Sequence, residues 1–491
     1  MRRARGAATL RGVGVAVVSF GFVLVARACA TTSTDYGAVA VAPESVDAQR
    51  AAEHLAQAVR IRTVSAGDGA VDATPWRELA ALLASAYPNV HAELDREAVG
   101  NGSLVYRWSG TDASLRPLLL LAHSDVVPVV EASLAAWTHP PFAGVIDGGF
   151  VWGRGTLDDK GGLVAILEAA ESLIATGFRP ARTVYLAFGH DEEIGGAAGA
   201  RAMAAAFAER GLRFEFVLDE GQAITTGIFP GLTAPLASIG VAEKGYLTVE
   251  LSVAAAGGHS STPPAATAIG ILAAAVAALE GHPLPASLDG TARRMLEATA
   301  PGVGAPMRLA LANLWLFGPL VERQMLGDAV AATLLRTTTA PTVFTAGVKD
   351  NVLPTEATAK VNFRVHPRDS VATVLEHVAR TVDDPRVSIR AVGTPVEPSP
   401  VSSADSAAYR TIARTVLETH PGVVVSPGLV VAGTDSRHYR SVAEDVYRFR
   451  PYVLAADDVA RIHGTDERIA VDVLAGCVRF YRRLLVNAAG S

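Results

Sequence analysis

The chain has 491 residues, 50% of them hydrophobic, and its 43 Lys and Arg residues against 49 Asp and Glu residues give a formal net charge of −6. This composition supplies enough apolar material for a large core and excludes a disordered chain, a collagen-like fibre and a small disulfide scaffold. A mildly acidic chain also lacks the basic surface of a general nucleic-acid binder, so no nucleic-acid partner is expected.

The first 30 residues have the pattern of an export signal. Several arginines precede an uncharged apolar run over residues 12–26, which is short for a membrane span of about 20 residues. Ala28-Cys29-Ala30 fits a cleavage site with small residues. We expect residues 1–30 to be a signal peptide or an N-terminal membrane anchor, with a disordered N-terminus as the alternative. The rest of the chain is then secreted, periplasmic or membrane-anchored outside the cytoplasm, with membrane contact only through the N-terminus.

From Ser45 the sequence alternates between helix and strand patterns. Helices are predicted over residues 45–60, 161–176 and 197–210, and continuous apolar strands over 117–122, 183–188 and 214–218. Apolar strands that alternate with helices predict an α/β domain with a mostly parallel sheet covered by helices.

The pattern changes near Val241. Strands over residues 246–254 and 358–365 alternate polar and apolar positions, and helices near 265–279 and 370–382 and a strand over 386–392 complete the set. This order is typical of a ferredoxin-like α+β unit, with residues 282–340 as an extra, helical stretch.

After Pro400 the first pattern resumes. Helices are predicted over residues 403–418 and 467–486, strands over 423–431 and 447–454, and a short helix near Ser436. We therefore expect a catalytic domain in two parts, residues 45–241 and 396–491, with a lid domain inserted over residues 242–395.

Two clusters in the first half of the chain contain candidate metal ligands. His123 and Asp125 follow a buried strand, and residues two apart in an extended segment share a face, as a ligand and its orienting carboxylate would. A core histidine beside a turn aspartate is the alternative. Asp158 and Asp159 open an apolar helix between glycines, where they either cap the helix or bridge two cations.

Two further acidic clusters follow predicted strands. Glu192 and Glu193 come before a glycine turn, and Asp219 and Glu220 end a buried strand. A solvated surface pair and a turn former are the respective alternatives. Together with the first two clusters, these residues suggest a two-metal site of carboxylates and imidazoles at one sheet edge.

The two cysteines cannot build a thiolate zinc site. Cys29 lies in the expected leader, so neither a structural disulfide with Cys477 nor a cysteine-ligated metal is expected. Oxygen and nitrogen ligands suit a co-catalytic zinc pair, with Mn or Co as substitutes.

The order of these motifs resembles that of the aminoacylase/carboxypeptidase family of dinuclear zinc peptidases. The motifs are HSDVVPV, GRGTLDDKGG, HDEEIGG, LDEG, GGHSSTPP, NVLP, GTDSRHY and IHGTDE, and the resemblance covers residues 45–487. The leader and the helical insert are most similar to the branch that contains vacuolar carboxypeptidase S and secreted N-acyl-amino-acid hydrolases.

The resemblance implies a ligand set for two Zn²⁺ ions. Asp158 would bridge both ions and join Asp159 through a cis peptide bond. His123 and Asp219 would complete one site, and Glu193 and a C-terminal histidine the other. Of the two candidates His438 and His463, the family pattern favours His463, although Asp466 stands where the family usually has asparagine.

The remaining roles also come from the resemblance. Glu192 would be the general base and Asp125 would orient His123. His259 would stabilise the oxyanion, often across a dimer or after lid closure, and a surface loop histidine is the alternative. Asn351 and Arg437 would bind the free carboxylate of the substrate.

The expected function is zinc-dependent hydrolysis of the amide bond of a C-terminal amino acid, in dipeptides, short peptides or N-acyl amino acids. A metal-activated water would attack, with Glu192 taking its proton. A homodimer through the lid is an expected assembly. The alternatives are a catalytically silent, metal-dependent binding protein and a co-catalytic zinc aminopeptidase.

Overall fold

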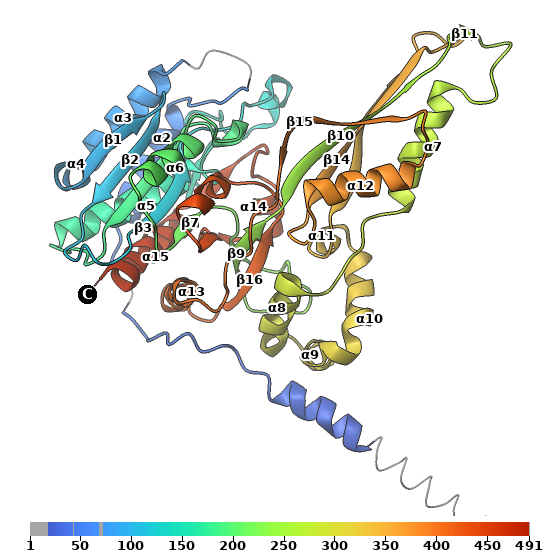
Figure 1. Cartoon of the computed structure of the whole chain (residues 1–491). Helices are drawn as coiled ribbons and strands as arrows, with labels where there is room; N and C mark the ends of the chain where they lie inside the picture. Colours follow the sequence, from blue (N-terminus) through green and yellow to red (C-terminus); the bar gives the residue numbers. More distant parts are fainter. Residues whose placement is uncertain (1–17, 43, 68–71, 491) are drawn as a thin grey trace, which may run out of the picture.

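The computed structural model describes residues 18–42, 44–67 and 72–490. Residues 1–17 of the expected leader lie outside the described residues. Residues 18–29 form a helix at the lower edge of the molecule (Figure 1), where the Asn313 side chain donates to the Leu24 carbonyl oxygen at 3.0 Å. None of the described helices combines the length and apolar character that crossing a bilayer requires.

A ten-stranded sheet forms the centre of the catalytic body. Its strands are β1 (Asp95–Val99), β2 (Ser103–Trp108), β3 (Leu118–His123), β6 (Val184–Gly189), β7 (Val217–Asp219), β8 (Ile224–Thr225), β9 (Leu236–Glu243), β16 (Val424–Val430), β17 (Val446–Arg448) and β18 (Val453–Leu454). They are ordered β1-β2-β6-β3-β7-β17-β9-β8-β18, with β16 beside β9. β3 runs parallel to both β6 and β7, whereas β1 and β2 form an antiparallel edge. The predicted α/β class is confirmed.

Helices cover both faces of this sheet. On one face lie α2 (Ala48–Arg60), α3 (Thr74–Ala86), α4 (Pro88–Glu93), α5 (Lys160–Ala175), α13 (Ala407–Thr419) and α15 (Val471–Ala489); the other carries α6 (Ala200–Glu209) and the 3-10 helix η4 (Asp435–Ser441). Successive side chains of β3 alternate between two cores: Leu118 and Leu120 face the first, and Leu119 and Leu121 the second. Burial on both faces explains the unbroken apolar run in the sequence.

Two predicted elements differ from the structure near the C-terminus. The strand predicted over residues 447–454 is two short strands, β17 and β18, because Pro451 between them has no N–H for a ladder. The helix predicted from residue 467 begins at Val471, since β19 (Arg468–Ala470) pairs with β5 (Phe150–Trp152). β5 also pairs with β4 (Val145–Asp147).

The second sheet has four antiparallel strands and extends away from the body (Figure 1). Its strands β12 (Thr338–Ala346), β14 (Glu356–Val365), β10 (Gly245–Ala254) and β15 (Ser388–Val396) lie in that order, with helices α7 (Ala268–Gly281) and α12 (Val371–Val382). Leu247, Val249, Leu251 and Val253 alternate along β10 into a core shared with both helices. The chain order strand-helix-strand-strand-helix-strand is that of a ferredoxin-like unit. We call these six elements the lid.

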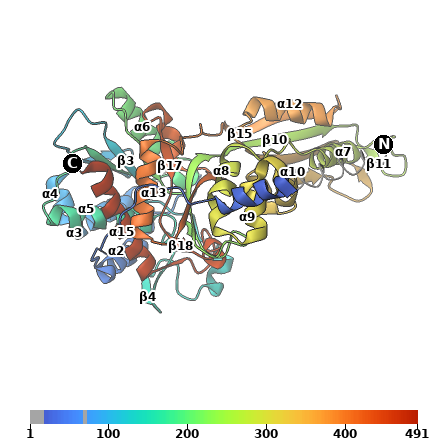
Figure 2. The same cartoon turned by 90° about the horizontal axis from the view of Figure 1, so that it is seen from below.

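A helical segment interrupts the lid between α7 and β12. It consists of α8 (Gly290–Thr299), α9 (Ala305–Ala312), α10 (Leu314–Leu326) and α11 (Ala329–Thr333). Leu296, Leu311 and Leu314, on α8, α9 and α10, pack with Leu232 and with Leu236 of β9, so these three helices share a core with the catalytic body and not with the lid sheet. Figure 2 shows α8, α9 and α10 together, with the helix of residues 18–29 across α10.

Candidate metal centre and active site

The candidate ligands gather at the carboxyl ends of three neighbouring strands. His123 is the last residue of β3, the 3-10 turn η2 (Glu192–Ile194) follows β6, and Asp219 ends β7. Parallel strands place these ends at one edge, where α/β proteins bind their ligands.

Asp125 connects the first two of these strand ends. Its carboxylate oxygens accept the backbone N–H groups of Glu192 and Glu193, at 3.2 and 3.1 Å. Nδ1 of His123 lies 3.0 Å from the Asp125 carbonyl oxygen and 3.4 Å from its carboxylate. Because both partners are acceptors, Nδ1 carries a ring proton, and Nε2, which faces Asp158, is the nitrogen that a bound cation would take.

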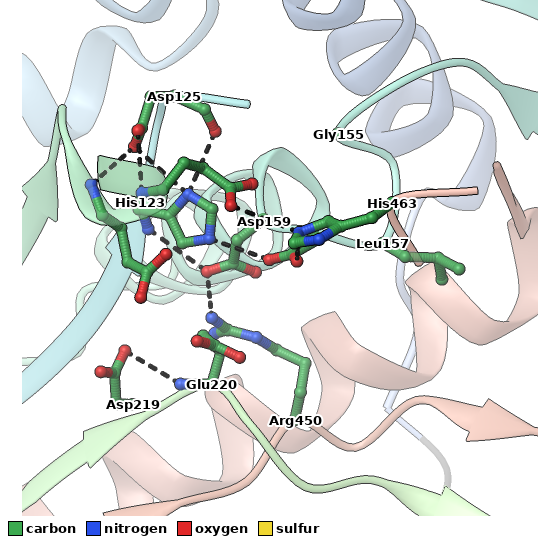
Figure 3. Close-up of polar contacts among 12 residues, drawn as sticks. His123, Asp125, Gly155, Leu157, Asp159, Asp219, Glu220, Arg450 and His463 are labelled. Atoms are coloured by element: carbon green, nitrogen blue, oxygen red, sulfur yellow. Dashed lines mark hydrogen bonds and ion pairs between the residues drawn. The ribbon is translucent and has the colours of Figure 1, made fainter. Parts of the chain in front are cut away.

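Two histidines face the two oxygens of Asp158. Nε2 of His123 lies 2.8 Å from Oδ1, and Nε2 of His463 lies 2.9 Å from Oδ2 and 3.3 Å from Glu193 Oε2. His123, Asp158 and Glu193 each place one potential ligand atom within 4.8 Å of the other two. Among the residues described, this is the one group of three or more such side chains that could hold a metal ion. Figure 3 shows the cluster with His463 entering from the side. The peptide bond between Asp158 and Asp159 is cis, as the resemblance implied.

The donor set fits divalent cations. Glu193 Oε1 is buried and has no hydrogen-bond partner. Burial, and then neighbouring carboxylates, raise the pKa values of Glu192 and Glu220 well above the ordinary value, so the negative charge here lacks compensation. Carboxylate oxygens and imidazole nitrogens without thiolates suit Zn, Mn or Co.

The pKa of His463 responds to the same carboxylates. Hydrogen bonds to Asp158 and then to Glu193 raise it to about 10. For His123, burial opposes the charged form, but hydrogen bonds to Asp125 and Asp158 still raise its pKa well above the ordinary value. Both rings therefore take up positive charge when only protons are available.

Asp219 lies beside the cluster, and its orientation is set by backbone groups. Its Oδ1 accepts the N–H of Glu220 at 2.9 Å, and its Oδ2 accepts the N–H of Ser436 at 2.7 Å. Figure 3 places Asp219 and Glu220 below the histidines, on the strand end of β7. The contribution of Ser436 was not anticipated from the sequence, because η4 is more than 200 residues away along the chain.

A buried ion pair underlies the centre and was not anticipated either. Arg450, between β17 and β18, pairs with Asp159 and donates to the hydroxyl of Tyr481. Asp159 in turn accepts the backbone N–H of His123 at 3.3 Å. No local signal in the sequence links Arg450 to the Asp158–Asp159 step.

The structure places His259 and Asn351 at the far tip of the lid. β11 (Gly258–His259) pairs with β13 (Val352–Leu353), and Ser260 N–H donates to the Asn351 carbonyl. This tip points away from β7 (Figure 1). Within one chain of this structure, neither residue is brought to the cluster.

Arg437 and His438 lie on η4, beside the cluster but outside it. His438 Nε2 lies 3.1 Å from the Gly195 carbonyl oxygen, so of the two candidate histidines only His463 contacts Asp158. Arg437 lines a cavity of about 220 Å³ together with Ser436, Arg440 and Arg448.

Comparisons with known proteins agree with this architecture. The model of the peptidase family M20/M25/M40 matches residues 119–487. The chain is 44% identical to a probable carboxypeptidase S-like 2 of Dictyostelium discoideum over 89% of this chain and 84% of the relative. It is 40% identical to the N-fatty-acyl-amino acid synthase/hydrolase PM20D1 of Xenopus tropicalis, over 89% of this chain and 85% of that protein.

Among solved structures, a family M20 metallo-carboxypeptidase, Sso-CP2 of Sulfolobus solfataricus, has a TM-score of 0.65 at 19% identity, covering 89% of this chain and 98% of that one. This likeness supports the fold: a catalytic body with an inserted lid. The family match spans most of the catalytic body and all of the lid, and the relatives are similar over most of their own length. The chain therefore belongs to the peptidase family M20/M25/M40.

Proposed function

We propose that the protein is a metal-dependent hydrolase that cleaves the amide bond between a C-terminal amino acid and an acyl group. The observation that carries this proposal is the convergence of His123, Asp158, Glu193 and His463 beside Glu192. Such a set combines metal ligands with an adjacent carboxylate that can move a proton.

The centre would hold two zinc ions. His123 and Asp219 would bind one ion, Glu193 and His463 the other, and Asp158 both. Bound zinc supplies Lewis acidity, which polarises an amide carbonyl and makes an attacking water more acidic. Asp125 fixes the tautomer of His123 through Nδ1 and so keeps Nε2 free to act as a ligand.

Glu192 is the proposed general base. Its backbone is held by Asp125, and burial, together with the neighbouring acids, raises the pKa of its carboxylate. A carboxylate with a raised pKa takes a proton from an attacking water more readily and can then pass it to the leaving nitrogen. A pure binding protein would have no use for this group.

The substrate class follows from the relatives and from Arg437. One relative is named for carboxypeptidase S and the other for N-fatty-acyl-amino acids. Both names imply a free carboxylate next to the cleaved bond, and a guanidinium in the 220 Å³ cavity can bind such a group by two hydrogen bonds. We propose N-acyl amino acids and short peptides as substrates.

His259 and Asn351 would reach the substrate from a second copy of the chain or after lid closure. β12 is an edge strand of the lid sheet, and its Val343 and Phe344 are exposed, so a homodimer through this edge would cover them. Sedimentation of the full chain, compared with a Phe344→Lys variant, tests this assembly.

We also propose that the N-terminal leader directs export of the protein.

The test of the function is a substrate panel with the zinc-loaded protein. N-acyl amino acids and Gly-Xaa dipeptides are expected to be cleaved, and amino-terminal amides with no free carboxylate are not. Glu192→Gln should lower kcat by 10²-fold or more while the protein still binds zinc. The matched control is Glu209→Gln on the exposed end of α6, which should keep full turnover. Unchanged kcat in Glu192→Gln, or preferred cleavage of free-amine amides, would refute the proposal.

A further inference from the structure

We propose that the buried Arg154–Glu467 ion pair is a positioning device that sets the separation of two metal ligands, Asp158 and His463. The inference rests on the proposed function, because it concerns the metals of that site. The hydrogen bonds of both side chains go to each other and to the backbone of the segments that carry the two ligands, and not to the ligand side chains.

Glu467 organises the loop that leads into Asp158. Its Oε1 accepts three backbone N–H groups in succession, from Gly155 at 3.0 Å, Leu157 at 2.9 Å and Asp158 at 3.3 Å. Oε2 accepts Nη1 of Arg154 at 2.6 Å. One carboxylate thus fixes the path of the chain between β5 and α5.

Arg154 extends this contact to the second ligand. Its Nη2 donates to the carbonyl oxygen of His463 at 3.0 Å, while Nη1 holds Glu467. The guanidinium lies under the ring of Trp137, with Cζ 5.6 Å from the ring centroid. A planar fork can hold two acceptors at once in a fixed geometry, so Arg154 connects the loop of Asp158 to the segment of His463.

The segment that Arg154 holds has an uncommon backbone. His463 has φ of 60° and Asp466 has φ of 58°, a left-handed conformation that non-glycine residues keep only where their surroundings enforce it. The Asp466 carboxylate accepts the N–H and the hydroxyl of Thr138 at 2.6 and 2.7 Å. With Arg154 on the carbonyl of His463, the segment is held at both ends.

The pair is also well shielded from water. The side chains of Arg154 and Glu467 are 4% and 0% exposed. In such a site, weakening one partner leaves a buried charge whose contacts cannot be replaced by water. A movement of the loop would therefore displace Asp158 and His463, because surface water cannot replace the lost contacts.

Two variants separate positioning from general stability. Glu467→Gln removes the charge and offers an amide N–H₂ where one of the acceptors was. Arg154→Lys keeps a charge for Glu467, but a single ammonium cannot reproduce the fork that also holds the His463 carbonyl. The matched control is Arg483→Lys, which weakens another ion pair, that of the half-buried Arg483 with the buried Glu418 carboxylate at 2.6 Å, between α15 and α13.

The readouts are the zinc dissociation constants of the metal-free proteins, measured by competition with a chromophoric chelator, and their melting temperatures. We expect Glu467→Gln to weaken zinc binding at least tenfold, and Arg154→Lys to weaken one of the two equivalents more than the other, because only one ion uses His463. In both, kcat should fall more than KM changes. The control should lower the melting temperature and leave zinc affinity within about twofold.

Several results would overturn the inference. Zinc affinity of both Glu467→Gln and Arg154→Lys within twofold of wild type would refute positioning and leave the proposed function intact. Equal weakening of zinc binding by the control variant would show that stability alone is involved. Failure of the wild-type protein to bind zinc would overturn the proposed function, and this inference with it. If Glu467→Gln does not fold, Arg154→Lys and Glu467→Asp decide the question by the same readouts.

Discussion

Replacing Asp125 with asparagine changes one oxygen into an amide nitrogen at the point where β3 is joined to the Glu192–Glu193 turn. Both carboxylate oxygens of Asp125 are occupied by backbone N–H donors, and the residue is fully buried. Asparagine has one acceptor oxygen, so one of the two N–H groups loses its partner and faces another donor.

The expected magnitude follows from that single lost contact. A hydrogen bond to a charged group contributes about 1.5–3 kcal/mol, and a buried unsatisfied donor costs a similar amount. If about 3 kcal/mol of this falls on the transition state, kcat/KM decreases by about 10²-fold. The tautomer of His123 should survive, because its Nδ1 also donates to the backbone carbonyl of residue 125.

The assay is steady-state hydrolysis of an N-acyl amino acid by Asp125→Asn, with zinc content measured on the same sample. Asp112→Asn is the matched control, since Asp112 is exposed and caps a turn by accepting the Ser114 N–H, as asparagine also can. The control should stay within twofold of wild type. A fully metallated Asp125→Asn enzyme with kcat/KM within threefold of wild type would refute the reasoning.

Three further predictions concern stability. Removal of metal with a chelator should abolish hydrolysis and lower the melting temperature, because the buried acids Glu220 and Asp435 then repel their neighbours uncompensated; calorimetry with and without zinc measures this. Burial and the charge of Arg479 lower the pKa of His420 from 6.5 to about 4, so the unfolded state binds more protons than the folded state. The free energy of unfolding should therefore decrease as pH falls below about 6.5, by about 2 kcal/mol at pH 5. His420→Gln should remove this part of the acid sensitivity, as measured by urea unfolding at several pH values. Gly110→Ala should destabilise by about 1–3 kcal/mol, because its Cβ would lie 2.4 Å from the backbone atoms Ala181 O and Thr183 N, whereas Gly281→Ala meets no atom within 4 Å.

Each of these predictions has a contrary result. If the metal-free protein had the same melting temperature as the zinc-loaded protein, the charge of the buried acids would be neutralised by something other than metal. An unchanged pH slope in His420→Gln would mean that this histidine is protonated in the native state. Equal destabilisation by Gly110→Ala and by Gly281→Ala would show that the close approach of the backbone at residue 110 is not what limits substitution.

The parts of the fold that could be predicted from the sequence are those with local signals. The unbroken apolar run of β3 and the two-residue period of β10 each report burial on two faces or one, and both strands form as predicted. The break between β17 and β18 was missed because the apolar pattern continues across Pro451. The start of α15 was placed too early because residues 468–470 pair with β5, a partner more than 300 residues away.

The site divides in the same way. His123, Asp158 and Glu193 lie in dense local motifs, and the sequence predicted them as neighbours. Arg154, Glu467 and Arg450 act only through partners distant in the chain, so no spacing rule could identify them. The position of His259 at the lid tip could not be predicted either, because it depends on the arrangement of the two domains.

The packing of α8–α10 on the catalytic body has a mechanical consequence for the lid. The chain crosses between body and lid at four places: before β10, after α7, before β12 and after β15. A domain inserted through a simple hinge would have two crossings and would swing freely about them. Four connections restrict such rotation more than two would, and a single proteolytic cut between α7 and α8 would leave the lid attached through the other three.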